Sequence, residues 1–170
     1  QVEILIALIK EILERHPEID PVDILAHADI APNRKSDPGP QFPWEELYKT
    51  GIGAWYDIGT ANKYLSQLKN QAASISELQC ALLTYGYPIK VTGEQDTQSK
   101  FAFRAFQLHF RPSSYNGLVD NETAAILYAL NEKYDRGPSD KNCKPHNRIS
   151  KIVLKHARNI RKYSNRISRT

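Results

Sequence analysis

The sequence predicts an α/β segment, then an all-α unit of three helices, and then a basic tail. Three observations predict this order. Residues 1–58 contain one helical pattern, one short alternating run and a loop, whereas residues 74–134 contain three amphipathic helical patterns. Residues 136–170 hold eleven Lys and Arg residues against one acidic residue, so the net charge of +4 comes from the tail. Residues 59–73 are predicted to be a linker, and the tail is taken to begin at residue 135.

The first helix is predicted over residues 2–15, where apolar side chains recur at helical spacing until Pro17. The alternating run at residues 22–26 predicts a strand that leads into His27. One helix and one strand cannot bury each other, so this segment is expected to need partners upstream of Gln1. The sequence contains no Met, which favours a chain that begins inside a longer gene product.

A loop dense in Pro, Gly, Asp and Asn follows over residues 27–42. A short helix is predicted after it, with Pro43 in its first turn and Gly51 just beyond its end. No stretch approaches the roughly 20 apolar residues that a membrane-spanning helix needs.

The second unit has a start signal for each of its three helices. Ser74 and Glu77 have the spacing of a capping box, and this helix is predicted to end at Gly86. Asp96 and Asp120 are expected to cap the second and third helices. The apolar faces of these two helices contain Phe103, Phe106, Phe110, Ile126, Leu127 and Leu130. Three such helices in about sixty residues predict a compact bundle.

The two cysteines are too few for a disulfide framework. Cys80 lies in an apolar helical pattern and is interpreted as a small buried residue. Cys143 lies in a polar stretch and is expected to be exposed. Neither cysteine decides the cellular compartment.

His27, Lys35 and Asp37 carry the candidate chemistry. A catalytic zinc site uses neutral imidazole and carboxylate ligands and keeps one position open for water. Asp37 is followed by Pro38, Gly39 and Pro40, which are expected to stiffen its loop. Lys35 could place an ammonium group where negative charge develops during acyl transfer. On spacing alone, however, a His followed by an Asp in a turn is more often structural than a metal site.

The stretch HADIAPNRKSDPGP at residues 27–40 closely resembles the signature of the zinc-dependent N-acetylmuramoyl-L-alanine amidases of type 2, which are related to the peptidoglycan recognition proteins. The likeness continues through residues 42–44 and 51–55. The resemblance implies Zn²⁺ as cofactor, His27 and Asp37 as two zinc ligands, and Lys35 as a residue that stabilises the transition state. The implied reaction is attack of a zinc-activated water on the amide between N-acetylmuramic acid and L-alanine.

The sequence departs from this family in one respect. The family's first zinc-ligand histidine and its catalytic glutamate lie on upstream strands, and neither has a counterpart here. The remaining histidines lie in unrelated contexts: His16, His109, His146 and His156. Because two protein ligands bind zinc poorly, the missing groups are expected upstream and this chain alone is expected to be an incomplete enzyme. The alternative is a peptidoglycan-binding fragment without activity.

Other residues near this stretch leave alternatives open. Arg34 could pair with a carboxylate of the stem peptide, or it could be a solvated loop charge. Trp44, Trp55 and Tyr56 could stack on sugar or peptide, but hydrophobic packing around the loop is the preferred interpretation.

The second unit resembles the three-helix peptidoglycan-binding domain found at the ends of many wall hydrolases. The matching residues are Leu83, Gly86, Tyr87, Phe106, Gln107, Asn116, Gly117, Asp120 and Thr123. Its pairing with the amidase stretch looks like the envelope branch of the family. This implies peptidoglycan or muropeptides as partners, and the bacterial cell envelope, periplasmic or associated with the outer membrane, as location, with a targeting signal outside this chain.

The basic tail has three interpretations. Apolar residues at near-helical spacing over residues 149–167 could form a cationic amphipathic helix on an anionic membrane or wall surface. A solvated or disordered extension is the slightly preferred interpretation. Its charge alone also suits nucleic acid, but residues 96–110 contain only Lys100 and Arg104 as cations, so no nucleic-acid partner is expected.

Overall fold

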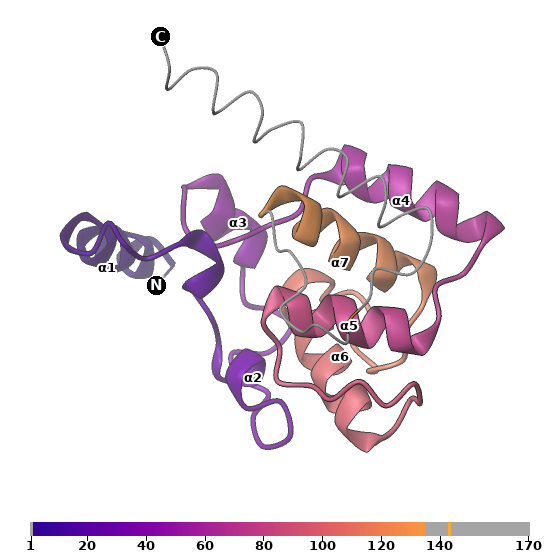
Figure 1. Cartoon of the computed structure of the whole chain (residues 1–170). Coiled ribbons are helices and arrows are strands. Elements are labelled where there is room, and N and C mark those ends of the chain that lie inside the picture. The colour runs from indigo at the N-terminus through magenta and orange to yellow at the C-terminus, as the bar shows by residue number, and fades with distance from the viewer. Residues whose placement is uncertain (1, 135–142, 144–170) are drawn as a thin grey trace, which may run out of the picture.

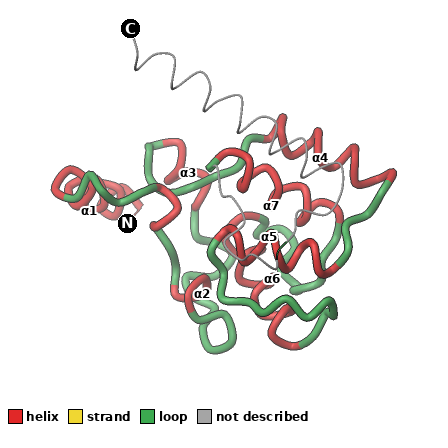
Figure 2. The backbone as a smooth tube through the Cα atoms, in the orientation of Figure 1, coloured by secondary structure: helices red, strands yellow, loops and turns green. Residues whose placement is uncertain are grey.

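The computed structural model describes residues 2–134 and Cys143 (Figure 1). That part of the chain contains helices joined by loops and no strand (Figure 2). The elements are α1 (Val2–Arg15), the 3-10 helix η1 (Pro21–Asp23), α2 (His27–Ile30), α3 (Trp44–Lys49), α4 (Ile58–Asn70), α5 (Ile75–Tyr85), α6 (Thr97–Phe110) and α7 (Asn121–Lys133). Apart from Cys143, the basic tail and its predicted amphipathic helix lie outside the described residues.

The predicted α/β class is wrong for the described residues, because the run at residues 22–26 forms no strand. Pro21 instead starts η1. The first N–H groups of a helix have no partner within the helix, so proline, which lacks an N–H, loses no hydrogen bond at this position. The Ala26 N–H donates to the Asp29 carboxylate at 2.8 Å, and α2 begins at His27. A strand needs a neighbouring strand for its backbone hydrogen bonds, and no other segment in the described range provides one.

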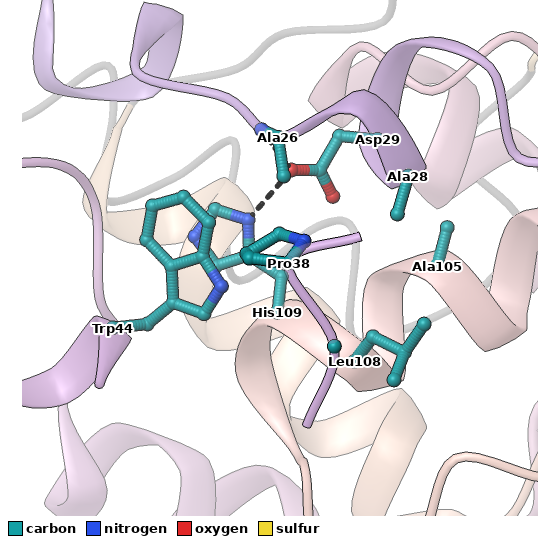
Figure 3. A pocket seen from close by; sticks show the side chains of 9 residues that line it. Ala26, Ala28, Asp29, Pro38, Trp44, Ala105, Leu108 and His109 are labelled. Carbon is teal, nitrogen blue, oxygen red and sulfur yellow. Dashed lines mark hydrogen bonds and ion pairs between the residues drawn. The ribbon is translucent and has the colours of Figure 1, made fainter. Parts of the chain in front are cut away.

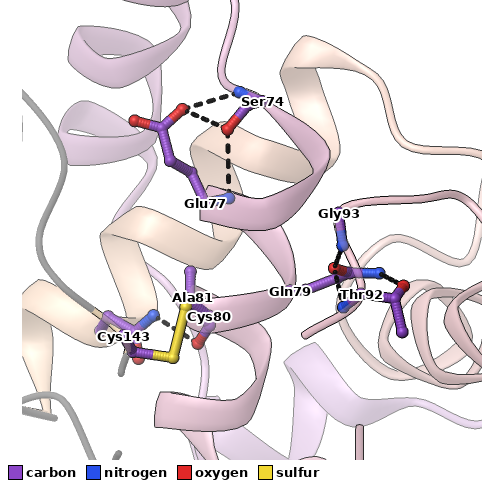
Figure 4. Close-up of a disulfide and its surroundings, with 9 residues drawn as sticks. Ser74, Glu77, Gln79, Cys80, Ala81, Thr92, Gly93 and Cys143 are labelled. Atoms are coloured by element: carbon purple, nitrogen blue, oxygen red, sulfur yellow. Dashed lines mark hydrogen bonds between the residues drawn. A yellow bond between two sulfur atoms is a disulfide. The ribbon is translucent and has the colours of Figure 1, made fainter. Parts of the chain in front are cut away.

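The three helices predicted for the second unit are confirmed as α5, α6 and α7. The Ser74 hydroxyl accepts from the Glu77 N–H at 3.2 Å, and the Glu77 carboxylate accepts from the Ser74 N–H at 2.7 Å (Figure 4). Gly86 ends α5 with a positive φ of 125°. Asp96 and Asp120 cap α6 and α7, each by accepting from a backbone N–H three residues later. Local capping chemistry therefore sets where these helices begin.

Helix α4 occupies most of the segment predicted as a linker, residues 59–73. Asp57 caps it by accepting from the Thr60 N–H at 2.7 Å. The helix packs against α7, where the Tyr64 hydroxyl donates to the Glu132 carboxylate at 2.5 Å. The domain boundary in this segment stays a prediction, but the segment itself is a helix packed on the bundle.

One hydrophobic core joins the N-terminal segment to the helical unit. Val22, Ala28 and Trp44 belong to the same buried cluster as Phe103 and Phe106 of α6. The short helix α2 packs directly against α6, as Figure 1 shows. The loop that carries the candidate chemistry therefore rests on the helical unit.

The helix predicted over residues 2–15 is confirmed as α1, and it lies apart from this core (Figure 1). None of its residues is buried. Its exposed large apolar side chains are Val2, Ile4, Leu8 and Ile12. Among the residues that the structure describes, no helix combines the length and the apolar character required to cross a membrane.

Two buried glutamine amides fix the loops on either side of α6. Gln79 of α5 accepts the Gly93 N–H at 2.8 Å (Figure 4). Gln107 of α6 accepts the Gly117 N–H and donates to the Leu118 carbonyl, both at 2.8 Å. Each amide thus supplies hydrogen bonds to a loop backbone that has no regular structure of its own.

Cys80 and Cys143 form a disulfide that spans 63 residues of sequence (Figure 4). The expectation that Cys143 is exposed is wrong, because this residue is buried. Cys80 is only partly buried, on the side of α5 where Cys143 meets it. Whether two cysteines pair depends on their separation in space, here 5.4 Å between Cα atoms, which sequence spacing does not reveal.

Removing this disulfide is expected to lower the free energy of unfolding by roughly 4 kcal/mol, the loop-closure value for a loop of this length. Cys80→Ser, Cys143→Ser and the double variant should lose similar amounts in urea denaturation, because each lacks the same bond. A double variant that loses the sum of the two single losses would contradict the bond, as would two free thiols in the folded, non-reduced protein.

Gly117→Ala is expected to destabilise the fold much more than Gly93→Ala. Both glycines have positive φ, 76° and 78°, so both variants lose roughly 1–2 kcal/mol to backbone strain. A Cβ on residue 117 would also lie 2.4 Å from the carbonyl oxygen of Lys100, whereas one on residue 93 meets nothing within 4 Å. The clash should add roughly 1–3 kcal/mol in urea denaturation. Equal losses in the two variants would show that the α6 backbone yields to the new methyl group.

Candidate functional site

The two predicted zinc ligands lie side by side on the loop that begins at α2. His27 Nδ1 lies 2.6 Å from Asp37 Oδ2, and their side chains are 65% and 55% exposed. The backbone brings them together, because the Ala28 N–H donates to the Asp37 carbonyl at 3.2 Å. Two exposed side chains that are ten positions apart in the sequence thus come into contact.

The loop between them is held by its own turns. The Ala31 carbonyl accepts from the N–H groups of Arg34 and Lys35, at 2.9 and 3.0 Å. Beyond Asp37, Gly39 has a φ of 86°, a conformation that glycine adopts without strain. Arg34 and Lys35 are both exposed, so the loop presents two cations and the His27–Asp37 pair to solvent.

The charges around Asp37 favour its ionised form. The hydrogen bond with His27 holds the pKa of Asp37 below its ordinary value of 3.8, and the positive charge of Lys35 acts in the same direction. Asp37 is therefore an anion at neutral pH, with a cationic side chain two residues away.

The neighbouring aromatic residues mainly pack, as the preferred interpretation held. Trp44 is buried and stacks on the imidazole of His109, with ring centroids 3.7 Å apart. Trp55 is also buried and stacks on Tyr56, which is half-buried, at 5.1 Å. Trp44 and Trp55 are therefore core residues, and Trp44 lies next to the loop at Pro38 and Gly39.

Asp29 carries a buried carboxylate close to the exposed pair, and the sequence did not predict its role. Asp29 Oδ1 accepts the Tyr87 hydroxyl at 2.5 Å. Its Oδ2 accepts the Ala26 N–H at 2.8 Å and lies 2.9 Å from Nδ1 of His109 (Figure 3). Asp29 and His109 are both almost fully buried. The only local signal was an aspartate placed to accept a backbone N–H at the start of a helix.

A small cavity lies beside this carboxylate (Figure 3). Its volume is about 10 Å³, about enough for one water molecule. Its walls come from α2, from the loop after Asp37 and from α6. The lining residues are Ala26, Ala28, Asp29, Pro38, Gly39, Trp44, Ala105, Leu108 and His109. Both ends of the candidate loop thus lie against the same face of α6.

The chain presents two side chains of the kinds that zinc binds. An imidazole nitrogen and a carboxylate oxygen are donors that zinc takes, and those of His27 and Asp37 are close together and exposed. Within residues 2–134 and Cys143, no group of three or more His, Cys, Asp and Glu side chains is placed to hold a metal ion. The pair therefore fits zinc as two ligands, one fewer than the three protein ligands of a catalytic site.

The helical unit and the exposed loop both have counterparts among known proteins. Residues 71–127 match the sequence profile of the family described as "Putative peptidoglycan binding domain". The predicted resemblance is confirmed: the chain is a homologue of the N-acetylmuramoyl-L-alanine amidases. It is 47% identical over 138 residues to the N-acetylmuramoyl-L-alanine amidase AmiD of Escherichia coli (strain K12), a match that covers 79% of this chain and 48% of that protein.

Two solved structures are also similar. AmpDh3 from Pseudomonas aeruginosa, in complex with an anhydromuramic pentapeptide, is 47% identical with a TM-score of 0.75. AmiD from E. coli, in complex with the substrate anhydro-N-acetylmuramic acid-L-Ala-D-γ-Glu-L-Lys, is 44% identical with a TM-score of 0.71. Each match covers 81% of this chain and 53% of the other. The chain thus spans about half the length of the relatives that it matches.

Tyr87→Phe is expected to flatten the loss of stability at alkaline pH. Burial raises the pKa of Tyr87 well above its ordinary value of 10.0, and the charge of Asp29 acts in the same direction. Above about pH 10 the unfolded chain releases this proton while the folded chain keeps it, so the free energy of unfolding falls by up to about 1.4 kcal/mol per pH unit. Urea denaturation between about pH 8 and 11 measures the slope. Tyr115→Phe is the control at an exposed ring, and a Tyr87→Phe slope equal to that of the parent would overturn the expectation.

Proposed function

We propose that this chain carries the zinc-binding loop of an N-acetylmuramoyl-L-alanine amidase that hydrolyses the amide between N-acetylmuramic acid and L-alanine in peptidoglycan. One observation carries the proposal: two exposed donors of the types that zinc takes, His27 Nδ1 and Asp37 Oδ2, lie 2.6 Å apart beside Lys35. The homology to amidases over four-fifths of the chain supports it, as does the match to a peptidoglycan-binding domain.

His27 and Asp37 would hold zinc as two of its protein ligands. When bound, zinc supplies a Lewis acid at the scissile carbonyl and a nucleophile at neutral pH. The hydrogen bond from His27 and the charge of Lys35 favour Asp37 as an anion, the form in which a carboxylate binds a cation. The chain spans about half the length of its relatives, and we place the first zinc-ligand histidine and the catalytic glutamate upstream of it in the full protein.

Lys35 would stabilise the negative charge that develops on the carbonyl oxygen. Its ammonium group is exposed and close enough to Asp37 to act on its pKa. A fixed cation at a developing oxyanion stabilises the transition state more than the substrate, and so raises kcat. Arg34 lies one residue earlier in the same turn and would pair with a carboxylate of the stem peptide, because a guanidinium group binds carboxylate through two parallel hydrogen bonds.

The substrate class follows from the relatives' bound ligands. AmpDh3 and AmiD bind anhydromuramyl peptides, so a muropeptide or the corresponding part of peptidoglycan is the expected substrate of this protein. The helical unit would hold the enzyme on the polymer, and the basic tail would add attraction to an anionic membrane or wall surface.

The bacterial cell envelope, periplasmic or associated with the outer membrane, is the proposed location. The disulfide between Cys80 and Cys143 supports it, because disulfides persist in oxidising compartments such as the periplasm and are rare in the cytosol.

A second candidate is a peptidoglycan-binding protein without activity. It is favoured by one observation: within the described residues, no third side chain completes a metal site beside His27 and Asp37. Both candidates bind peptidoglycan, and they differ in whether they release peptides that begin at L-alanine.

Digestion of purified peptidoglycan, with mass spectrometry of the released peptides, tests the proposal. The chain is assayed beside a version extended upstream, each with zinc and with a chelator. In the extended protein we expect release of L-alanyl peptides that the chelator abolishes. Lys35→Ala should lower kcat by roughly 10²–10³-fold, the usual effect of losing an oxyanion-stabilising group. Asp37→Ala should abolish the zinc-dependent activity.

Lys63→Ala is the matched control, because Lys63 is an exposed cation on α4. It should leave kcat unchanged. Sedimentation with peptidoglycan but no peptide release from either length of the protein would favour the binding protein over the amidase.

A further inference from the structure

The exposed candidate ligands and the buried carboxylate are parts of one short helix. His27 opens α2 and faces solvent, whereas Asp29, two residues later, is buried. The carboxylate of Asp29 is bonded to residues 58 and 80 positions further along the chain, Tyr87 and His109. These two contacts connect the candidate loop to the peptidoglycan-binding unit.

Both oxygens of the Asp29 carboxylate are used. Oδ1 accepts from Tyr87, and Oδ2 accepts from the Ala26 N–H and from His109 Nδ1. Burial raises the pKa of Tyr87 well above its ordinary value, so its hydroxyl stays a donor. In the described part of the chain, His109 Nε2 has no hydrogen-bond partner and Nδ1 faces Asp29, which favours a ring proton on Nδ1. A buried carboxylate that loses one of these donors is left underpaired, which is costly.

Packing reinforces the hydrogen bonds. The His109 ring lies between Trp44, at 3.7 Å between ring centroids, and Phe110, at 4.0 Å, and is nearly parallel to both. Ala28 at one end of the loop and Pro38 at the other line the same small cavity against α6 (Figure 3). Because both ends of the loop lie against this region, a shift of His109 would displace both candidate ligands together.

We propose that Asp29, Tyr87 and His109 are positioning residues that fix the His27–Asp37 loop in its working geometry. The helical unit is then part of the active-site framework as well as a means of attachment to the wall. The inference rests on the function proposed above for the His27–Asp37 pair. Residues that do not bind a metal themselves but orient its ligands commonly contribute 10–100-fold to metal affinity or activity.

Hydrogen exchange in the 170-residue chain tests the coupling without reference to catalysis. In Tyr87→Phe and His109→Leu, peptides that cover residues 27–37 should exchange about tenfold faster than in the parent, because the loop loses its anchor. His109→Asn should largely restore slow exchange, since its amide N–H can take the place of Nδ1–H.

Gln79→Leu is the matched control. It removes a buried side chain that also bonds to a loop backbone, but its partners lie at residues 92–99 and not at Asp29. Exchange should rise around residues 90–99 in this variant and stay unchanged at residues 27–37. Faster loop exchange in Gln79→Leu as well would mean that general destabilisation loosens the loop, which overturns the proposal.

Kinetics of the extended protein on peptidoglycan give the second readout. Tyr87→Phe should lower kcat about tenfold with little change in KM, because it misplaces the ligands and leaves substrate binding intact. An unchanged kcat, or unchanged loop exchange in both Tyr87→Phe and His109→Leu, overturns the positioning role. A parent protein without amidase activity, whose loop still loosens in these variants, would overturn the proposed function while the coupling stands.

Discussion

The buried carboxylate of Asp29 is the interaction on which the arrangement of this chain depends. In the described range the segment before α5 has no sheet to join, and its buried apolar residues, such as Trp44 and Trp55, share one core with the helical unit. The loop that begins at α2 is in addition fixed by a polar contact in the protein interior, where an underpaired carboxylate would be costly. Tyr87 and His109 meet that requirement from two different parts of the helical unit. The chain can satisfy all three groups in only one relative placement of loop and helices, so the contact specifies geometry as well as adding stability.

Buried polar side chains also bond to loops elsewhere in the fold. Gln79 and Gln107 project from helices and bond to the backbones of the loops before and after α6. A loop without regular structure cannot satisfy its own N–H and carbonyl groups, and buried amides do this in place of a neighbouring strand. Buried side chains therefore fix these two loops, although the described part of the chain contains no strand.

The sequence predicted those features that depend on neighbours within a few residues. Ser74, Asp96 and Asp120 cap their helices as expected, because a cap bonds to an N–H three residues later. Helix α4 was missed although Asp57, Tyr64 and Leu68 carry the same kind of signal, a cap followed by apolar residues at helical spacing. The strand at residues 22–26 was wrong for a different reason: alternation describes one strand but not its partner. The pairing of Cys80 with Cys143 likewise depends on a separation in space that the sequence does not contain.

In the candidate site, too, the contacts between residues near in sequence could be predicted, and those between distant residues could not. His27 and Asp37 are ten residues apart, near enough in sequence for one local motif to include both, and the structure places them side by side. The partners of Asp29 are 58 and 80 residues away, so no local pattern could identify them. His27 and Asp29 are two residues apart in α2, which is about 200° around the helix axis, so one faces solvent and the other faces the core. A ligand on a loop gains precision from whatever fixes that loop's backbone, and here that is a carboxylate held by another part of the chain. The helical unit thus reaches the loop of the His27–Asp37 pair through two buried side chains, Tyr87 and His109.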